Sequence, residues 1–207
     1  MREASGRERR RSRTRTAILD QALAIMREAG IDGIALRELA RRLDYSPAAL
    51  YRYFDNREQL IATLAADAMA RLAERLRVAA GDGDTDPLLR LGEAYLAFAQ
   101  EEPVRFRLLF VDLPSARTSL RALPPHHSPY RIVLAAARTA IAQGRLSPRL
   151  DAESVAYTLW SLVHGMAVLE STHLRGFDAD FAGVHRLALQ HLVASWMPGE
   201  REGGRKG

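Results

Sequence analysis

Apolar residues along this chain recur at intervals of three and four positions, and no stretch keeps the alternation of a β-strand. Ile18, Ala22 and Ile25, for example, fall on one face of a helix that Gly30 ends. Similar stripes lie in residues 36–43, 50–54, 60–76, 88–98, 106–110, 130–143, 151–172 and 179–196. The pattern therefore predicts an all-α protein of about nine helices.

Capping residues mark several of the predicted helix starts. Ser46 followed by Pro47 is such a signal, because the hydroxyl can accept a backbone N–H bond and proline fits the first helical position. Asn56, Asp86 and Asp151 predict further starts in the same way. Residues 112–127 contain three prolines and no periodicity, so we expect an irregular loop there.

Positive charge is concentrated at the N-terminus. Residues 1–16 contain seven arginines and two glutamates, which accounts for the whole formal net charge of +5. A basic segment attracts polyanions, either nucleic acid or an anionic membrane, but it can equally be a solvated, disordered tail. The composition of the chain, 47% apolar and 27% charged, is that of a globular protein able to bury a core.

Several classes of function lack the residues they need. The chain has no cysteine, which excludes disulfides and thiolate sites and suits a reducing cytoplasm, where we expect the protein. The longest uncharged run, residues 154–169, is shorter than the roughly 20 residues of a membrane span. No HExxH, GxGxxG or phosphate-loop motif occurs, and His126 and His127 lack a third ligand at useful spacing. We expect no metal, no cofactor, no membrane partner and no catalysis.

Residues 36–54 have the pattern of a helix-turn-helix, two short helices joined by a tight turn. Ala40 is small enough to let the second helix cross closely, and Asp44 tolerates the left-handed conformation that the turn calls for. Residues with small side chains begin the second helix, and the free backbone N–H groups at its start can bind a phosphate. Helical hairpins of similar spacing also occur in protein cores, so the pattern alone leaves contact with DNA open.

The continuation LYRYFDNREQL, residues 50–60, sharpens this interpretation. With the preceding helix and Gly30 it resembles the N-terminal DNA-binding region of the TetR family of transcriptional regulators, over residues 14–64. The resemblance implies recognition-helix positions that face double-stranded DNA, and it puts Arg57 where the family usually has a phosphate-binding lysine. The expected DNA-binding residues are Arg37, Ser46, Pro47, Ala48, Ala49, Tyr51, Arg52, Tyr53 and Arg57.

The sequence departs from the family pattern at two positions. Ala35 stands where the family commonly has a threonine that caps the helix and touches phosphate, and Asp44 replaces the usual turn glycine. Residues 17–60 hold six arginines against seven acidic residues, so docking must depend on where individual arginines lie. Each of them can instead be part of a solvated helix face.

The C-terminal half carries a second resemblance. Residues 159–165, LWSLVHG, resemble the Trp…His-Gly signature of one TetR subgroup. We expect the last two helices to form a homodimer interface across a two-fold axis, although they can also simply complete the monomer core. A pocket for a small-molecule effector is the usual companion, with the loop 112–127 as its gate. Its expected lining is Tyr95, Phe98, Phe106, Phe110, Tyr130, Trp160 and His164, each of which can also be ordinary core.

The sequence thus predicts a basic disordered arm (1–13), a helix-turn-helix domain (14–60), a helical ligand-binding and dimerisation domain (61–198) and a disordered tail (199–207). We expect a ligand-responsive regulator, foremost a repressor that binds a palindromic operator as a dimer and is released by a small apolar effector. One alternative is a helical small-molecule binding protein whose helix-turn-helix does not bind DNA. Another is a helical enzyme or a membrane-surface protein that uses the basic arm.

Overall fold

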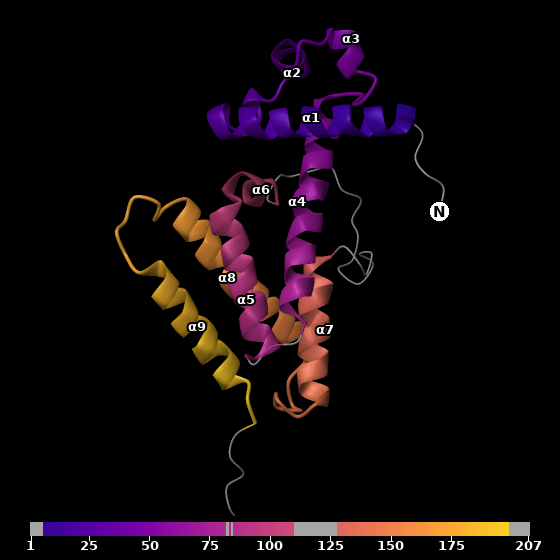
Figure 1. Cartoon of the computed structure of the whole chain (residues 1–207). Coiled ribbons are helices and arrows are strands. Elements are labelled where there is room, and N and C mark those ends of the chain that lie inside the picture. Colours follow the sequence, from indigo (N-terminus) through magenta and orange to yellow (C-terminus); the bar gives the residue numbers. More distant parts are fainter. Residues whose placement is uncertain (1–5, 82, 84, 110–127, 199–207) are drawn as a thin grey trace, which may run out of the picture. The chain divides into compact units, whose positions relative to one another are not determined.

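The computed structural model describes residues 6–81, 83, 85–109 and 128–198. These residues form nine α-helices and one short 3-10 helix, with no β-strand among them, which confirms the predicted all-α class (Figure 1). The elements are α1 (Gly6–Ala29), η1 (Ile31–Gly33), α2 (Leu36–Arg42), α3 (Pro47–Leu50), α4 (Arg57–Ala79), α5 (Pro87–Glu101), α6 (Pro103–Leu108), α7 (Pro129–Ala142), α8 (Ala152–Ser171) and α9 (Phe181–Ser195).

The chain divides into two compact units, and the division falls inside α4. The first unit is Met1–Ala68 with Val104–Pro114, and the second is Met69–Pro103 with Ser115–Gly207. The boundary expected after residue 60 is therefore earlier than the structural one. The reason is that α4 continues to bury apolar side chains in the first unit as far as Ala68.

The first unit is built on one face of α1. Ile18, Ala22 and Ile25 are buried there, as predicted, together with apolar residues of α2, α3, α4 and α6. Figure 1 shows α2 and α3 on one side of α1, and α2 packs against both α1 and α3. Burial of this stripe stabilises the unit, and helices as short as α2 and α3 depend on such packing because isolated short helices are unstable in water.

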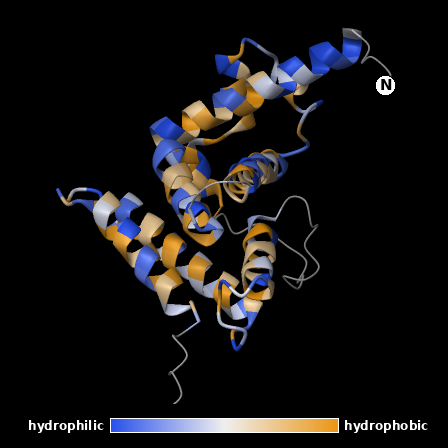
Figure 2. Cartoon of the chain, turned by 60° about the horizontal axis from the view of Figure 1, so that its bottom comes forward, coloured by the Kyte–Doolittle hydropathy of each residue, from blue (hydrophilic) through white to orange (hydrophobic). Residues whose placement is uncertain are grey.

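The arginines between residues 7 and 15 lie in a helix. Residues 6–13 are the first turns of α1, so the expectation of disorder is wrong for them, while residues 1–5 lie outside the described residues. Arginine and glutamate have high helix propensity, and residues 7–29 contain neither glycine nor proline, so the helix extends outward from its packed half. Figure 2 shows this hydrophilic end of α1 in blue.

The predicted caps and stops are present. Asn56 Oδ1 accepts the N–H of Gln59 at 2.7 Å, Asp86 Oδ1 accepts that of Leu88 at 2.8 Å, and Asp151 Oδ2 accepts that of Ser154 at 2.9 Å. Gly30 and Gly144 follow helix ends with φ of 72° and 71°, a conformation that glycine adopts without a steric penalty. Local sequence therefore sets these helix boundaries.

In the second unit, α8 packs against α5 and α7, and α9 packs against α5 and α8. Gly92 lets α5 and α9 approach closely, because a Cβ atom there would lie 2.6 Å from Leu189 Cδ2. Helix α8, whose residues 154–169 carry no charge, is buried along one face, through Leu159 and Val163 among others, but Tyr157 on another face is 65% exposed. The loop 112–127, the tail 199–207 and the residues Phe110, His126 and His127 lie outside the described residues.

Candidate nucleic-acid interface and aromatic cluster

The turn between α2 and α3 is a Schellman motif built on Asp44. The N–H of Tyr45 donates to the carbonyl of Ala40 at 2.9 Å, and the N–H of Asp44 donates to that of Arg41 at 3.4 Å. Asp44 has φ of 57°, which confirms the predicted left-handed turn residue. This geometry ends α2 at Arg42 and lets the chain start α3 at Pro47, after four intervening residues.

Helix α3 is short, and it is held by a cap at its start and by packing along one side. Ser46 Oγ accepts the N–H of Ala49 at 3.3 Å and Pro47 occupies the first turn, as predicted. Leu50 is fully buried and Phe54, just after the helix, is 1% exposed. The opposite side is open: Ser46, Pro47 and Ala48 are exposed, and Ala49 is half-buried. The result is a helix with a slim, accessible N-terminal edge, which suits close approach to base edges in a major groove.

Three tyrosines surround this edge with different exposure. Tyr51 is 50% exposed and Tyr45 is 42% exposed, whereas Tyr53 is half-buried and packs against the core of the first unit. Tyr53 therefore has a packing role besides the DNA contact expected for it. Tyr45, directly before the Ser46 cap, was not among the DNA-binding residues expected from the sequence, and its exposure makes it a further candidate.

Some arginines of α2 form ion pairs with glutamates, and another is available to contact DNA. Arg41 and Arg42 both bind Glu38, at 2.7 Å and 2.8 Å, and Arg42 also binds Glu28 at 2.8 Å. The hydrogen bonds from Arg41 and Arg42 lower the pKa of Glu38 to about 2, so the carboxylate stays charged and keeps neutralising them.

Arg37 and Arg52 are the cations that remain available at this surface. Both are exposed, and within the described part of the chain neither makes a hydrogen bond or an ion pair. Ala35 lies at the N-cap of α2 and makes no side-chain cap bond, as expected from the missing threonine. Phosphate contact near α2 thus depends on Arg37 and on backbone N–H groups.

Arg57 has internal partners. Its Nε donates to the carbonyl of Ile34 and its Nη2 to that of Ile31, both at 2.8 Å, with Asp32 Oδ1 3.8 Å away. These bonds tie the first turn of α4 to the carbonyl groups of η1. The phosphate contact implied by the resemblance stays a prediction, and the structure gives Arg57 a positioning role.

The second unit contains a cluster of four rings that the sequence had singled out. Tyr95 Oη and His164 Nδ1 are 2.7 Å apart, and the Trp160 ring centroid lies 5.8 Å from that of Tyr95 and 6.0 Å from that of Tyr130. Burial raises the pKa of Tyr95 and lowers the pKa of His164. Both side chains are therefore uncharged near neutral pH, and the cluster carries no formal charge.

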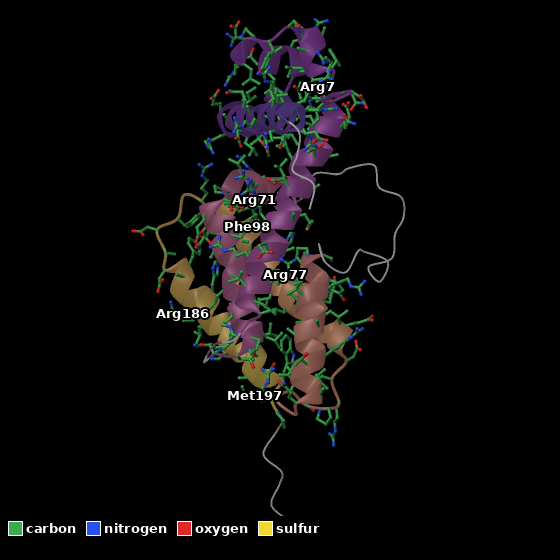
Figure 3. The ribbon with its side chains drawn as sticks, turned by 45° about the vertical axis from the view of Figure 1, so that its right-hand side comes forward. Arg7, Arg71, Arg77, Phe98, Arg186 and Met197 are labelled. Carbon is green, nitrogen blue, oxygen red and sulfur yellow. The ribbon has the colours of Figure 1, made fainter. Side chains whose placement is uncertain are left out.

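A small space of about 10 Å³ lies beside this cluster, lined by Tyr95, Trp160 and aliphatic residues of α4, α5, α7 and α8. That is room for about one water molecule. Phe98, labelled in Figure 3, is buried on α5. Phe106 is buried on α6 in the first unit, so its place in the same pocket, like that of Phe110, stays a prediction.

An open groove that the sequence did not indicate follows α7. It has a volume of about 350 Å³, is lined by small apolar residues such as Ala135 and Ala136, and is flanked by Arg131 and Arg145. Arg145 Nη1 is held by Asp86 Oδ2 at 3.0 Å. No motif marks such a surface, because it arises from alanines on the outer face of an otherwise ordinary helix.

The described residues hold neither a metal cluster nor a membrane-spanning helix. Among them, no three acidic or histidine side chains are placed to share a metal ion. None of the helices within the same residues is both long and apolar enough to cross a membrane.

Two family profiles match the chain. One, described as bacterial regulatory proteins of the tetR family, matches residues 18–64. The other, described as a tetracyclin repressor-like C-terminal domain, matches residues 88–193, more than half of the chain. The chain belongs to the TetR family. Neither match tests the Trp…His-Gly subgroup.

Individual relatives agree with this assignment. The HTH-type transcriptional regulator YobS of Bacillus subtilis is 27% identical over 158 residues, 75% of this chain and 78% of YobS. The solved structure of the regulatory protein SCO4313 is 29% identical, covers 92% of this chain and 100% of its own, and has a TM-score of 0.74. The SmeT–triclosan complex, 21% identical with 90% and 92% covered and a TM-score of 0.66, shares the fold. The protein is thus a TetR-family transcriptional regulator with an N-terminal helix-turn-helix.

The left-handed turn predicts an effect of Asp44 on stability. In this TetR-family protein, Asp44→Gly should raise the free energy of unfolding by about 1 kcal/mol, because glycine adopts positive φ without a Cβ clash. Asp44→Asn, which removes the charge but keeps the Cβ, should change it by less than about 0.5 kcal/mol. Urea unfolding at a fixed protein concentration measures both, and equal effects of the two variants would contradict a backbone origin.

The lowered pKa of His164 predicts a pH dependence. The unfolded chain protonates this histidine around its ordinary value of 6.5, whereas the folded protein does so only at lower pH. Stability that is present above pH 6.5 is therefore lost as the pH falls toward the folded pKa. His164→Gln, which can still hydrogen-bond Tyr95, should lose less stability than the wild type between pH 7.5 and about 5.5. Identical losses in urea unfolding would mean that His164 titrates normally.

Proposed function

We propose that this TetR-family protein is a dimeric repressor that binds a near-palindromic operator through α3 and is released by a small, uncharged, apolar effector. The observation that carries the proposal is the open N-terminal edge of α3, with exposed Ser46, Pro47 and Ala48 above fully buried Leu50. A helix with small exposed side chains on one edge and a buried anchor on the other suits insertion into a major groove.

Each exposed side chain has a role in this proposal. Ser46 and Ala48 lie against base edges, and Tyr51 donates its hydroxyl to a phosphate at the rim of the groove. Arg37 and Arg52 neutralise phosphates, and their lack of internal partners within the described chain supports this assignment. Arg57 donates to the backbone carbonyl groups of Ile34 and Ile31, and these bonds fix the start of α4 relative to η1.

The dimer is proposed to form through α8 and α9. Tyr157 on α8 and Val184 and Leu187 on α9 are 65%, 62% and 53% exposed, so they do not complete the core of their own second unit. Exposed apolar side chains on two adjacent helices suit an isologous four-helix contact across a two-fold axis. Such a dimer presents two copies of α3 related by the same axis, which is why the operator is expected to be palindromic.

The effector is proposed to enter the ring cluster of the second unit. Among the described residues, none with a charge lines the 10 Å³ space beside Tyr95 and Trp160, which favours an uncharged apolar molecule over an ion. A ligand larger than one water must push Trp160 and its neighbours apart, and that displacement is the proposed link between ligand and DNA. Binding of the two is then antagonistic, through one reciprocal coupling free energy.

Two finer assignments belong to the same proposal. We assign the C-terminal domain to the Trp…His-Gly subgroup on Trp160, His164 and Gly165. Because the ligand of such a repressor must reach it beside bacterial DNA, the protein is expected to act in the cytoplasm and without catalysis.

Replacing one exposed residue of α3 tests DNA binding. The wild type should enrich a palindrome from a random duplex pool, and Tyr51→Ala should weaken binding to that duplex about tenfold or more. Its free energy of unfolding should change by less than about 0.5 kcal/mol, because the side chain is half exposed. Fluorescence anisotropy with the selected duplex gives the affinity.

Phe177→Ala is the matched control, since Phe177 is an aromatic residue 67% exposed in the second unit. It should bind the duplex like the wild type. If the wild type enriches no duplex, the alternative holds, a small-molecule binding protein whose helix-turn-helix does not bind DNA. If Tyr51→Ala binds normally, the assignment of α3 is wrong.

The dimer interface has its own test. Leu187→Glu should convert the dimer to a monomer in sedimentation experiments, because a charge at a buried interface lacks a partner. Val78→Glu, at a residue of α4 that is 73% exposed, should leave the dimer intact. A monomeric wild type, or an unaffected Leu187→Glu variant, would exclude α9 from the interface.

A further inference from the structure

The outer half of α1 carries arginines in a regular order. Arg7, Arg11 and Arg15 are spaced by four, and Ile18, three residues after Arg15, and Ala22 continue the same helix face into the buried core. Positions four apart are rotated by about 40° around a helix, so the three arginines extend the core-facing side of α1 past the end of the core. Arg9 and Arg13 lie on the opposite side, about 160° away.

Arg15 connects this series to the helix-turn-helix. Its guanidinium lies over the Phe54 ring, 5.3 Å from the centroid, and its Nη2 donates to Thr63 Oγ1 at 3.5 Å. Phe54 lies shortly after α3, so Arg15, the last arginine of the series, is fixed beside the proposed recognition element. Arg11 and Arg7 lie about 6 Å and 12 Å farther along the axis. Figure 3 labels Arg7 on this part of α1.

Arg7 and Arg11 are exposed and, among the described residues, have no acidic or hydrogen-bonding partner. Glu8, the one acid among residues 6–16, has an interaction of its own. Like charges four residues apart repel each other in a helix, and a row of anions beside them relieves that repulsion. The 6 Å spacing is close to two base-pair steps of DNA, about 7 Å along its axis.

We propose that Arg7, Arg11 and Arg15 form a stripe on α1 that contacts the phosphate backbone of duplex DNA beside the groove entered by α3. This proposal rests on the proposed function, because α1 has to meet the same duplex. The arginines belong to a formed helix instead of a disordered arm, so little ordering entropy is lost when they bind.

Duplex DNA is favoured over a membrane surface by the residues between the arginines. A helix that lies on a lipid bilayer needs large apolar side chains opposite its basic face. Residues 6–17 include none, since Ala17 is their single apolar residue apart from glycine. The segment is basic around its whole circumference, which suits an electrostatic contact without insertion.

Two variants of equal charge test the stripe. Arg7→Ala/Arg11→Ala and Arg9→Ala/Arg13→Ala remove the same charge at the same spacing from opposite sides of α1. The duplex selected by the wild type and a scrambled duplex are titrated between about 50 and 200 mM KCl. Circular dichroism should show both variants folded, because alanine favours helix and the four side chains are exposed.

Arg7→Ala/Arg11→Ala should reduce the slope of log affinity against log salt by about 2 per protomer, and equally on both duplexes, because phosphate contacts carry no sequence information. Arg9→Ala/Arg13→Ala should change the slope by less than half as much. If the two variants reduced the salt slope equally, only the number of charges would matter and not the side of α1 on which they lie, and this would overturn the stripe.

Other outcomes separate this proposal from the proposed function. If the wild type binds its selected duplex and neither variant changes the salt slope, the stripe fails while DNA binding by α3 stands. If the wild type binds no duplex, both proposals fail. Loss of sedimentation with vesicles of anionic lipid in Arg7→Ala/Arg11→Ala, with DNA binding unchanged, would overturn the stripe in favour of a membrane contact.

Discussion

Burial of Leu50 and Phe54 in the core of the first unit is the constraint on which the candidate DNA surface depends. Helix α3 has only four residues, too few to be stable alone, so its position comes from these two anchors and from the Ser46 cap. Each anchor contributes about 1.5–3 kcal/mol of burial. Because α3 is held from one side only, its other side can be made of small side chains that contribute nothing to the fold.

Much of the first unit could be predicted because its signals are local. The Ser46–Pro47 start and the left-handed Asp44 are decided within a few residues, and the structure has both. The internal bonds of Arg57 could not be predicted, since its partners are carbonyl groups more than twenty residues away in a 3-10 turn without a sequence signature. The helical state of residues 6–13 was missed because charge density suggests disorder, whereas helix propensity and continuity with a packed helix decided the outcome.

The second unit was less predictable for a physical reason. Aromatic residues at helical spacing give the same sequence pattern whether they fill a core or line a ligand site. The sequence could therefore name seven candidates but could not tell which of them line a pocket. The structure brings Tyr95, Tyr130, Trp160 and His164 together and leaves almost no free volume beside them. An uncharged run such as that of α8 likewise suggests burial on all sides, and only three-dimensional packing reveals that Tyr157 is exposed.

The charged residues that attract DNA of any sequence lie apart from the residues proposed to recognise a particular sequence. Within residues 17–60 the acids balance the arginines, and Arg41 and Arg42 are neutralised by Glu38 and Glu28, so the body of the helix-turn-helix has little general attraction for DNA. All of the net positive charge lies in the segment that precedes Ile18. A regulator built in this way can alter its general attraction for DNA through α1 without altering α3. The same separation explains how a recognition surface with so few free cations can still serve a protein that must find one site among many.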